Sequence, residues 1–221
     1  MQIAKIQLLG LCLLALLGFN RVAGAATLFP HRTLGWNKIP NITVLGQEGD
    51  SRNQLIVDAV DFWNQQLAEI GNGFKLGPIR FVSQILPSAE LAAMSQSMLD
   101  GQRIPEPPSG FMQIDGDLII ALSDGAFVSF TMSFPKTDKR LIALRSFQAP
   151  LFRFTNVGRN VVAHELGHAI GLGHNDDPSK LMCGRPASCR PEQFRSDVER
   201  FFPLMEEEKQ ILLKLYPPTW K

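Results

Sequence analysis

The hydrophobic pattern of this chain changes between the period of a strand and the period of a helix. Residues 36–46 alternate loosely and predict a strand that ends in a turn. In residues 50–71 apolar side chains recur every three or four positions, which predicts an amphipathic helix packed on a sheet. Asp50 or Ser51 is expected to cap that helix, and Gly71 to end it. The apolar side of the helix carries Ile56, Val60, Trp63, Leu67 and Ile70.

The middle of the chain predicts more strands and one short helix. Residues 78–85 predict a strand, and residues 88–99 predict a short helix. Residues 101–110 contain three prolines and no periodic pattern, so we expect a loop there. Turn residues then separate three apolar segments, each typical of a strand. These three predicted strands are residues 117–125, 127–135 and 139–147.

Two helices are predicted in the last third of the chain. The first begins near Thr155 or Asn156 as cap, and steps of about 100° per residue place His164 and His168 on one side of it. The opposite, apolar side is expected to pack on the core. The second helix covers residues 203–218, with a proline in its first turn and a proline pair at its end. The apolar side of the first helix carries Val162, Leu166, Ala169 and Ile170.

The first 25 residues have the layout of a cleavable signal peptide. Lys5 precedes an apolar run at residues 6–19, and small residues close the segment. The run is shorter than the roughly 20 apolar residues of a membrane-spanning helix, so we expect no stable membrane insertion after residues 1–25 are removed. The mature chain would then be residues 26–221, a single domain located outside the cell or in the periplasm.

Composition and charge exclude several classes of partner. The chain has 22 basic and 21 acidic residues and no long run of either sign, which argues against nucleic-acid binding and a polybasic membrane patch. Its 221 residues suffice for the core of one substantial domain, and we expect a monomer. After removal of the signal peptide only Cys183 and Cys189 remain. Export favours a disulfide between them, and the alternative is two unpaired cysteines in a reducing compartment.

Three of the four histidines lie within residues 164–174, which read HELGHAIGLGH. His164 and His168 are four residues apart, so on a helix both rings can face one metal ion. Gly171 can take the left-handed conformation that ends the helix, and His174 can then turn back as a third ligand. Three neutral imidazoles suit zinc and leave one coordination position for water, which is typical of a catalytic site.

Glu165 lies beside the histidine side of the predicted helix. Its carboxylate is expected to act as a general base, taking a proton from the attacking water and passing it to the leaving amine. Calcium is a second candidate ion, at the acidic turn of Asp115 and Asp117 or at Asp124. Such carboxylates otherwise lie in solvated turns.

The motif at residues 164–174 resembles the extended HExxHxxGxxH signature of metzincin zinc peptidases, and the segment after it resembles the matrixin branch. In that branch Met182, eight residues after His174, would lie in a Met-turn and form an apolar floor beneath the histidines. The order of predicted elements over residues 36–217 also resembles a matrixin catalytic domain. The resemblance implies an α+β fold with a twisted mixed sheet, a long packing helix, an active-site helix and a C-terminal helix.

The resemblance also implies how substrate and metal would bind. In matrixins the strand at the edge of the sheet pairs with an extended peptide, and residues 127–134 are the candidate for it. The chain lacks the histidines of a second, structural zinc and the cysteine of many matrixin zymogens, so we expect one zinc ion and no latency of that kind. Cys183 replaces the usual tyrosine, so one wall of the pocket is expected to differ. The candidate substrate-binding residues are Phe127, Val128, Ser129, Phe130 and Thr131.

Together these patterns predict a secreted zinc-dependent endopeptidase that acts on protein or peptide substrates. Two alternatives stay open. The first is a catalytically silent zinc-binding or adhesion module, against which the intact Glu165 argues. The second is a zinc hydrolase that acts on a non-peptide amide or ester, which the same chemistry permits.

Overall fold

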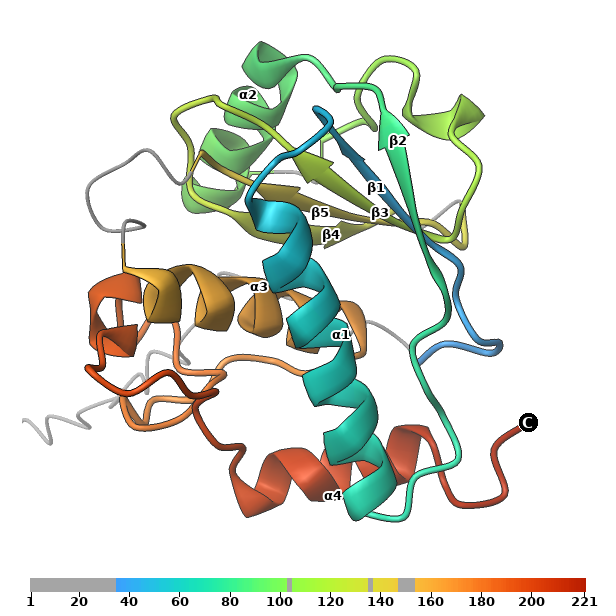
Figure 1. Ribbon diagram of the computed structural model, residues 1–221, viewed down its shortest axis with the longest axis vertical. Coiled ribbons are helices and arrows are strands. Elements are labelled where there is room, and N and C mark those ends of the chain that lie inside the picture. Colours follow the sequence, from blue (N-terminus) through green and yellow to red (C-terminus); the bar gives the residue numbers. More distant parts are fainter. Residues whose placement is uncertain (1–34, 103–104, 135–136, 147–153) are drawn as a thin grey trace, which may run out of the picture.

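A mixed sheet of five strands separates two layers of helices (Figure 1). The computed structural model describes residues 35–102, 105–134, 137–146 and 154–221, so the predicted signal peptide lies outside the described residues. The strands follow the order β2-β1-β3-β5-β4, in which the first four are parallel and β4 runs antiparallel to β5 at the edge. Their bounds are Ile42–Gly46 (β1), Ile79–Ser83 (β2), Leu118–Leu122 (β3), Phe130–Ser133 (β4) and Arg140–Leu144 (β5).

Helices cover both faces of this sheet. One face carries α2, and the other carries α1 and α3, with α4 on the same side but farther from the sheet (Figure 1). This arrangement confirms the predicted α+β architecture with its long packing helix, motif helix and C-terminal helix. The bounds are Arg52–Glu69 (α1), Ser88–Leu99 (α2), Thr155–Ala169 (α3) and Glu206–Leu215 (α4), with short 3-10 turns at Phe111–Gln113 (η1) and Pro191–Phe194 (η3).

Within the described ranges, no helix combines the length and the apolar character needed to cross a membrane.

The central strands bury side chains on both faces of the sheet. In β3, Leu118 and Ile120 join the core under α1 and α3, whereas Ile119 and Ala121 join the core under α2. All four side chains are fully buried. Because successive residues of a strand point to opposite faces, two covered faces require the nearly unbroken apolar sequence that this strand has.

Every predicted strand and helix is present, although several ends differ from the prediction. The α2 bounds agree with the prediction, and the strands are shorter than predicted. At the start of α1, Ser51 occupies the cap position without a side-chain hydrogen bond. Asp50 takes the capping role instead, since its carboxylate accepts the Arg52 N–H at 2.9 Å.

The C-terminal helix begins later than predicted. It starts at Glu206, so the expectation that Pro203 occupies its first turn is wrong. Met205 has an extended backbone, and its N–H donates to the Glu208 carboxylate at 2.8 Å. This bond caps the helix at Glu206, because Glu208 supplies an acceptor to a donor that the first turn leaves unpaired.

The start of α3 also differs from the prediction. Phe154 occupies its cap position, and neither Thr155 nor Asn156 caps the helix through its side chain. Asn156 is buried and binds a later part of the chain instead. Its amide donates to the Phe194 carbonyl at 2.7 Å and accepts the Arg200 N–H at 2.8 Å. The Asn156 side chain therefore binds residues 194–200 to the start of α3.

Three side chains from distant parts of the chain hold the C-terminal end of α3. Trp36 Nε1 donates to the Ala169 carbonyl at 2.9 Å, and Arg140 Nη1 donates to the same oxygen. Tyr216 Oη donates to the Ile170 carbonyl at 2.8 Å and accepts the Trp36 N–H at 3.0 Å. These bonds satisfy carbonyls that a helix end leaves without partners. The end of α3 is thereby fixed relative to Trp36, which precedes β1, and to Tyr216, which follows α4.

We expect Tyr216→Phe to lower the free energy of unfolding by about 2 kcal/mol, because the Ile170 carbonyl and the Trp36 N–H would lose a buried partner. Urea denaturation at equilibrium measures this change. Gln210→Ala is the control, since Gln210 is exposed on the neighbouring helix and its removal should stay within about 0.5 kcal/mol. Equal unfolding midpoints for Tyr216→Phe and the parent chain would contradict the proposed contribution of these bonds.

Candidate metal centre

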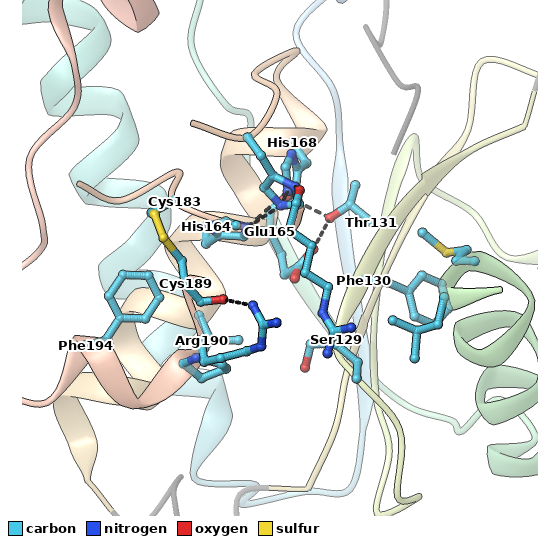
Figure 2. Close-up of a pocket in the computed structure, with 18 of the residues that line it drawn as sticks. Ser129, Phe130, Thr131, His164, Glu165, His168, Cys183, Cys189, Arg190 and Phe194 are labelled. Carbon is cyan, nitrogen blue, oxygen red and sulfur yellow. Dashed lines mark hydrogen bonds between the residues drawn. A yellow bond between two sulfur atoms is a disulfide. The ribbon is translucent and has the colours of Figure 1, made fainter. Parts of the chain in front are cut away.

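Three histidine side chains converge on one point beside α3 (Figure 2). The Nε2 atoms are 3.1 Å apart for His164 and His168, 3.1 Å for His164 and His174, and 2.9 Å for His168 and His174. Nitrogen ligands at about 2.0–2.1 Å from a tetrahedral zinc ion would be about 3.3–3.4 Å apart, so these separations fit one such ion. In the part of the chain that the structure describes, this is the one group of metal-binding side chains that comes together.

A backbone carbonyl faces the Nδ1 atom of each ring. Since a carbonyl oxygen only accepts, each Nδ1 carries the proton and each Nε2 keeps its lone pair. Burial lowers the pKa of His164 to about 3 and also lowers the pKa of His174, so both rings are neutral at pH 7. The lone pairs therefore point at one place, as the ligands of a metal ion must. The contacts are His164 with Leu181 O at 2.8 Å, His168 with Leu172 O at 2.9 Å, and His174 with Arg185 O at 2.8 Å.

Gly171 ends α3 and turns the chain back toward the first two histidines, as predicted. Its φ is 111°, in the region that favours glycine. The Gly171 N–H bonds to the His168 carbonyl and the Leu172 N–H bonds to the Gly167 carbonyl, both at 3.0 Å. This pair of bonds is a Schellman motif. The same turn places the Leu172 carbonyl on His168, so the helix end also orients a candidate ligand.

Met182 packs directly against α3. It is fully buried and follows Leu181, whose carbonyl binds His164. A Cβ atom at Gly167 would lie 2.9 Å from the Met182 methyl carbon and 2.9 Å from Trp63 Cζ2. Helix and methionine therefore approach as closely as a glycine permits. The contact places Met182 beside the turn of α3 that carries two of the histidines, where the matrixin resemblance predicted it, and its role as a floor stays a prediction.

Glu165 faces the centre from within the protein and is only 6% exposed (Figure 2). Thr131 Oγ1 donates to Glu165 Oε2 at 2.7 Å and lies 2.8 Å from the Glu165 carbonyl oxygen. Burial raises the pKa of the Glu165 carboxyl to about 7, although the bond from Thr131 lowers it. A carboxyl group with a pKa near 7 takes up and releases protons at neutral pH. The sequence pattern placed Thr131 on a substrate strand and did not indicate this contact.

A cavity of about 280 Å³ opens beside the histidines. One wall comes from Val128, Ser129, Phe130 and Thr131, which are four of the five predicted substrate-binding residues. The opposite wall comes from the loop after Met182 and from η3 (Figure 2). The fifth predicted residue, Phe127, is buried and packs in the core under α2. The structure therefore brings most of the predicted strand and all three histidines around one cavity.

The predicted substrate strand is only partly a strand. β4 begins at Phe130 and lies at the edge of the sheet. Before it, the Val128 N–H donates to Ser95 Oγ at 3.1 Å, and the same hydroxyl donates to the Val128 carbonyl at 2.9 Å. Both backbone groups of Val128 therefore have a partner in Ser95, although its carbonyl oxygen keeps a second lone pair, and pairing of Val128 with a peptide stays a prediction. Pairing of a substrate along β4 stays a prediction.

The structure contains the predicted disulfide between Cys183 and Cys189, whose Cα atoms are 5.8 Å apart. Both cysteines line the cavity, so the bridge forms part of its wall (Figure 2). Residues 184–188 form the loop that the bridge closes. Arg185, whose carbonyl faces His174, lies in this loop, and Leu181, whose carbonyl faces His164, lies two residues before Cys183, so the bridge restrains the backbone near both carbonyls.

The buried carboxylate of Glu208 on α4 binds Asn175, which in turn contacts the backbone of Met182. Asn175 Nδ2 donates to Glu208 Oε1 at 2.7 Å, and the Asn175 N–H bonds to the Met182 carbonyl at 2.9 Å. Burial raises the pKa of the Glu208 carboxyl. The sequence pattern does not indicate this contact, because Glu208 stands in a run of three glutamates that is typical of an exposed first helical turn.

The carboxylates considered for calcium each face a cationic side chain. These contacts already place positive charge beside each carboxylate, and calcium binding there stays a prediction. The pairs are Asp117 with Lys38 at 2.6 Å, Asp115 with Arg80 at 3.1 Å, and Asp124 with Arg52 at 3.4 Å.

Comparison with known proteins gives one family match. The family model described as Matrixin matches residues 52–199, which is more than half of the chain. No curated protein matches the chain.

Three solved structures show weak similarity. The archaemetzincin of Methanopyrus kandleri is 16% identical, with 85% of this chain and 98% of that chain covered and a TM-score of 0.42. A zinc-dependent peptidase of Methanocorpusculum labreanum is 14% identical, with 78% and 99% covered and a TM-score of 0.39. The archaemetzincin of Archaeoglobus fulgidus, in complex with malonate, is 15% identical, with 77% and 98% covered and a TM-score of 0.35. At these TM-scores the similarity carries no weight for function.

We expect Gly167→Ala to lower the free energy of unfolding by about 1–3 kcal/mol, because the new methyl group would displace Met182 and Trp63. Chemical denaturation measures the change. Gly173→Ala is a matched control, since a Cβ atom there would meet no atom within 4 Å. Alanine is a better helix former than glycine by about 1 kcal/mol, so a rise in stability of about that size for Gly167→Ala would contradict the close packing.

Proposed function

Because this chain belongs to the matrixin family of zinc-dependent peptidases, we propose that it is a secreted endopeptidase that cleaves internal peptide bonds. The observation that carries this proposal is the convergence of three imidazole lone pairs beside one buried carboxylate. Neutral imidazoles are ligands that zinc prefers, and a non-ligating carboxyl with a pKa of about 7 suits a proton carrier.

His164, His168 and His174 would hold one zinc ion through their Nε2 atoms. Three nitrogen ligands from the protein satisfy the usual requirement of a catalytic zinc site. When bound, zinc supplies a Lewis acid that polarises the carbonyl group of the substrate and lowers the pKa of water. The three carbonyls on the Nδ1 atoms keep each ring in the tautomer that binds metal.

Glu165 would move the proton of the reaction. A carboxylate oxygen of Glu165 takes one proton from the attacking water and gives it to the nitrogen of the leaving amine, so the C–N bond breaks with charges balanced. Thr131 holds Oε2 of this carboxylate at 2.7 Å and so limits its rotation. The low exposure of Glu165 keeps bulk water from exchanging that proton freely.

Two features favour an endopeptidase over an aminopeptidase. β4 lies at the edge of the sheet beside the cavity, so an extended chain can pair with it and continue past the centre in both directions. An aminopeptidase needs an acidic group for the free ammonium of its substrate. Among the described residues that line the cavity, Glu165 is the one acidic side chain, and it is assigned to proton transfer.

Family membership weighs against the two alternatives, a catalytically silent zinc-binding module and a hydrolase of non-peptide amides or esters. A zinc-binding module without catalysis does not require a buried carboxylate oriented by Thr131 beside the histidines. The second predicts a zinc-loaded chain that cleaves esters or simple amides and leaves peptides intact. A comparison of peptide and ester substrates distinguishes them.

Export is proposed from the leader pattern of residues 1–25, with residues 26–221 as the mature domain. The disulfide between Cys183 and Cys189 supports an oxidising location. N-terminal sequencing of the protein recovered outside the producing cell tests the cleavage position. Recovery of an uncleaved chain inside the cell would contradict the proposal.

We expect Glu165→Gln to lower kcat on peptide substrates by about 10²–10⁴-fold, because the amide cannot take up the proton. Zinc content, measured by elemental analysis, should stay at one ion per chain, since Glu165 is not a proposed ligand. Glu199→Gln is the control, because Glu199 is an exposed acid paired with Arg159 and should leave kcat unchanged. Full activity of Glu165→Gln would assign the base to another residue. Absence of peptide cleavage by the zinc-loaded parent chain would favour the two alternatives.

We expect Thr131→Val to lower kcat about tenfold and to change KM less than twofold, because the Glu165 carboxylate loses the bond that orients it. Thr131→Ser, which keeps the hydroxyl group, should restore most of kcat. Steady-state kinetics on one quenched peptide measure both parameters. Equal kcat values for the valine and serine variants would show that the hydroxyl group has no positioning role.

A further inference from the structure

The cavity beside the histidines carries more positive than negative charge. Arg145, Arg185 and Arg190 line it, whereas Glu165 is the one acidic side chain among its described lining residues. Three cationic side chains therefore line the cavity beside one acidic side chain. A metal ion bound by the histidines would add to this excess. The electrostatic potential of the cavity therefore favours an anionic group of a ligand.

Arg190 is held by the backbone of its own loop (Figure 2). It follows Cys189 directly, so the disulfide fixes its backbone to Cys183. Its Nη1 atom donates to the Ala187 carbonyl at 3.0 Å and to the Cys189 carbonyl. The side chain is half-buried and lines the cavity. Bonds to two backbone carbonyls hold the guanidinium in place without neutralising its charge.

Unlike Arg52 and Arg159, Arg190 has no carboxylate partner among the described residues. Arg52 pairs with Asp50 at 2.5 Å, and Arg159 pairs with Glu199 at 2.9 Å. No carboxylate of the described residues forms an ion pair with Arg190. A held, half-buried guanidinium with free donors is the usual means of recognising a carboxylate, because its planar N–H groups match two oxygens.

We propose that the cavity binds a carboxylate of the substrate, and that Arg190 is the residue that selects it. This inference rests on the proposed peptidase function and specifies its substrate class. The lining also includes the apolar side chains of Met98, Leu99, Val161 and Phe194, which suit methylene groups. A glutamate side chain combines both features, with an aliphatic stem and a terminal carboxylate. The substrate is therefore a peptide with an acidic side chain next to the cleaved bond.

A free C-terminal carboxylate has the same chemistry, so the test must separate the two sources. Quenched peptides with amidated C-termini would carry glutamate, glutamine or leucine at each position within two residues of the cleaved bond. A second set would carry glutamine there and a free C-terminus. Glutamine matches glutamate in shape, so their comparison isolates the charge. The full mature chain, loaded with zinc, is the enzyme in each assay.

We expect glutamate to exceed glutamine by about tenfold in kcat/KM at one position, and Arg190→Gln to remove most of this preference. Arg190→Gln should still cleave the glutamine peptide. Arg80→Gln is the matched control, because Arg80 lies on β2 at the opposite edge of the sheet and should leave the preference unchanged. The preference should also fall at high ionic strength, since Arg190 is only half-buried.

If no peptide is cleaved, calorimetry can still measure peptide binding to the zinc-loaded Glu165→Gln variant. Tighter binding of the glutamate peptide, lost in Glu165→Gln/Arg190→Gln, would support the carboxylate site while the proposed endopeptidase fails. A preference confined to free C-termini would keep Arg190 as the selecting residue and assign the carboxylate to the chain end. Equal cleavage and equal binding of glutamate, glutamine and free C-terminal peptides would overturn the inference.

Discussion

Three imidazole rings must aim one nitrogen each at a single point, and this requirement constrains the rest of the structure. A histidine ring has only two nitrogens, so its orientation is fixed once the second nitrogen is bound. Here backbone carbonyls bind all three second nitrogens, and each carbonyl belongs to a turn. The centre is therefore only as rigid as those turns. The carbonyls come from Leu172, Leu181 and Arg185.

Buried polar side chains hold the turns in place. The end of α3 is held through Trp36, Arg140 and Tyr216, and the segment around Met182 is held through Asn175 and Glu208. A buried polar group without a partner costs more free energy than a typical hydrogen bond contributes. Conformations of these turns that break one of the contacts are therefore disfavoured. The hydrophobic core positions α3 against α1 and the sheet, and the polar contacts then set the orientation of its last turn.

The sequence predicted the elements and the motif more reliably than the contacts around them. Strands, helices and the histidine spacing follow from local periodicity, which is visible in one sequence. The partners Thr131, Asn175 and Glu208 could not be predicted, because each lies far along the chain from what it touches. Glu208 also stands in a sequence typical of a solvated helix start, where nothing local indicates burial. At Pro203 a local signal for a helix start was misleading. The helix begins at Glu206 instead, where the bond from the Met205 N–H to the Glu208 carboxylate caps it.

Residues 181–190 orient the metal-binding histidines and also line the cavity that would select the substrate. They use backbone atoms for the first role and side-chain atoms for the second. Its backbone carbonyls at Leu181 and Arg185 orient two of the rings, and every residue type offers a carbonyl. Its side chains at Arg185 and Arg190 face the cavity. A change of side chain at these two positions therefore alters the charge of the cavity and leaves the acceptors of the rings in place. The disulfide between Cys183 and Cys189 adds to this separation, since it keeps the backbone of the loop fixed when the side chains change.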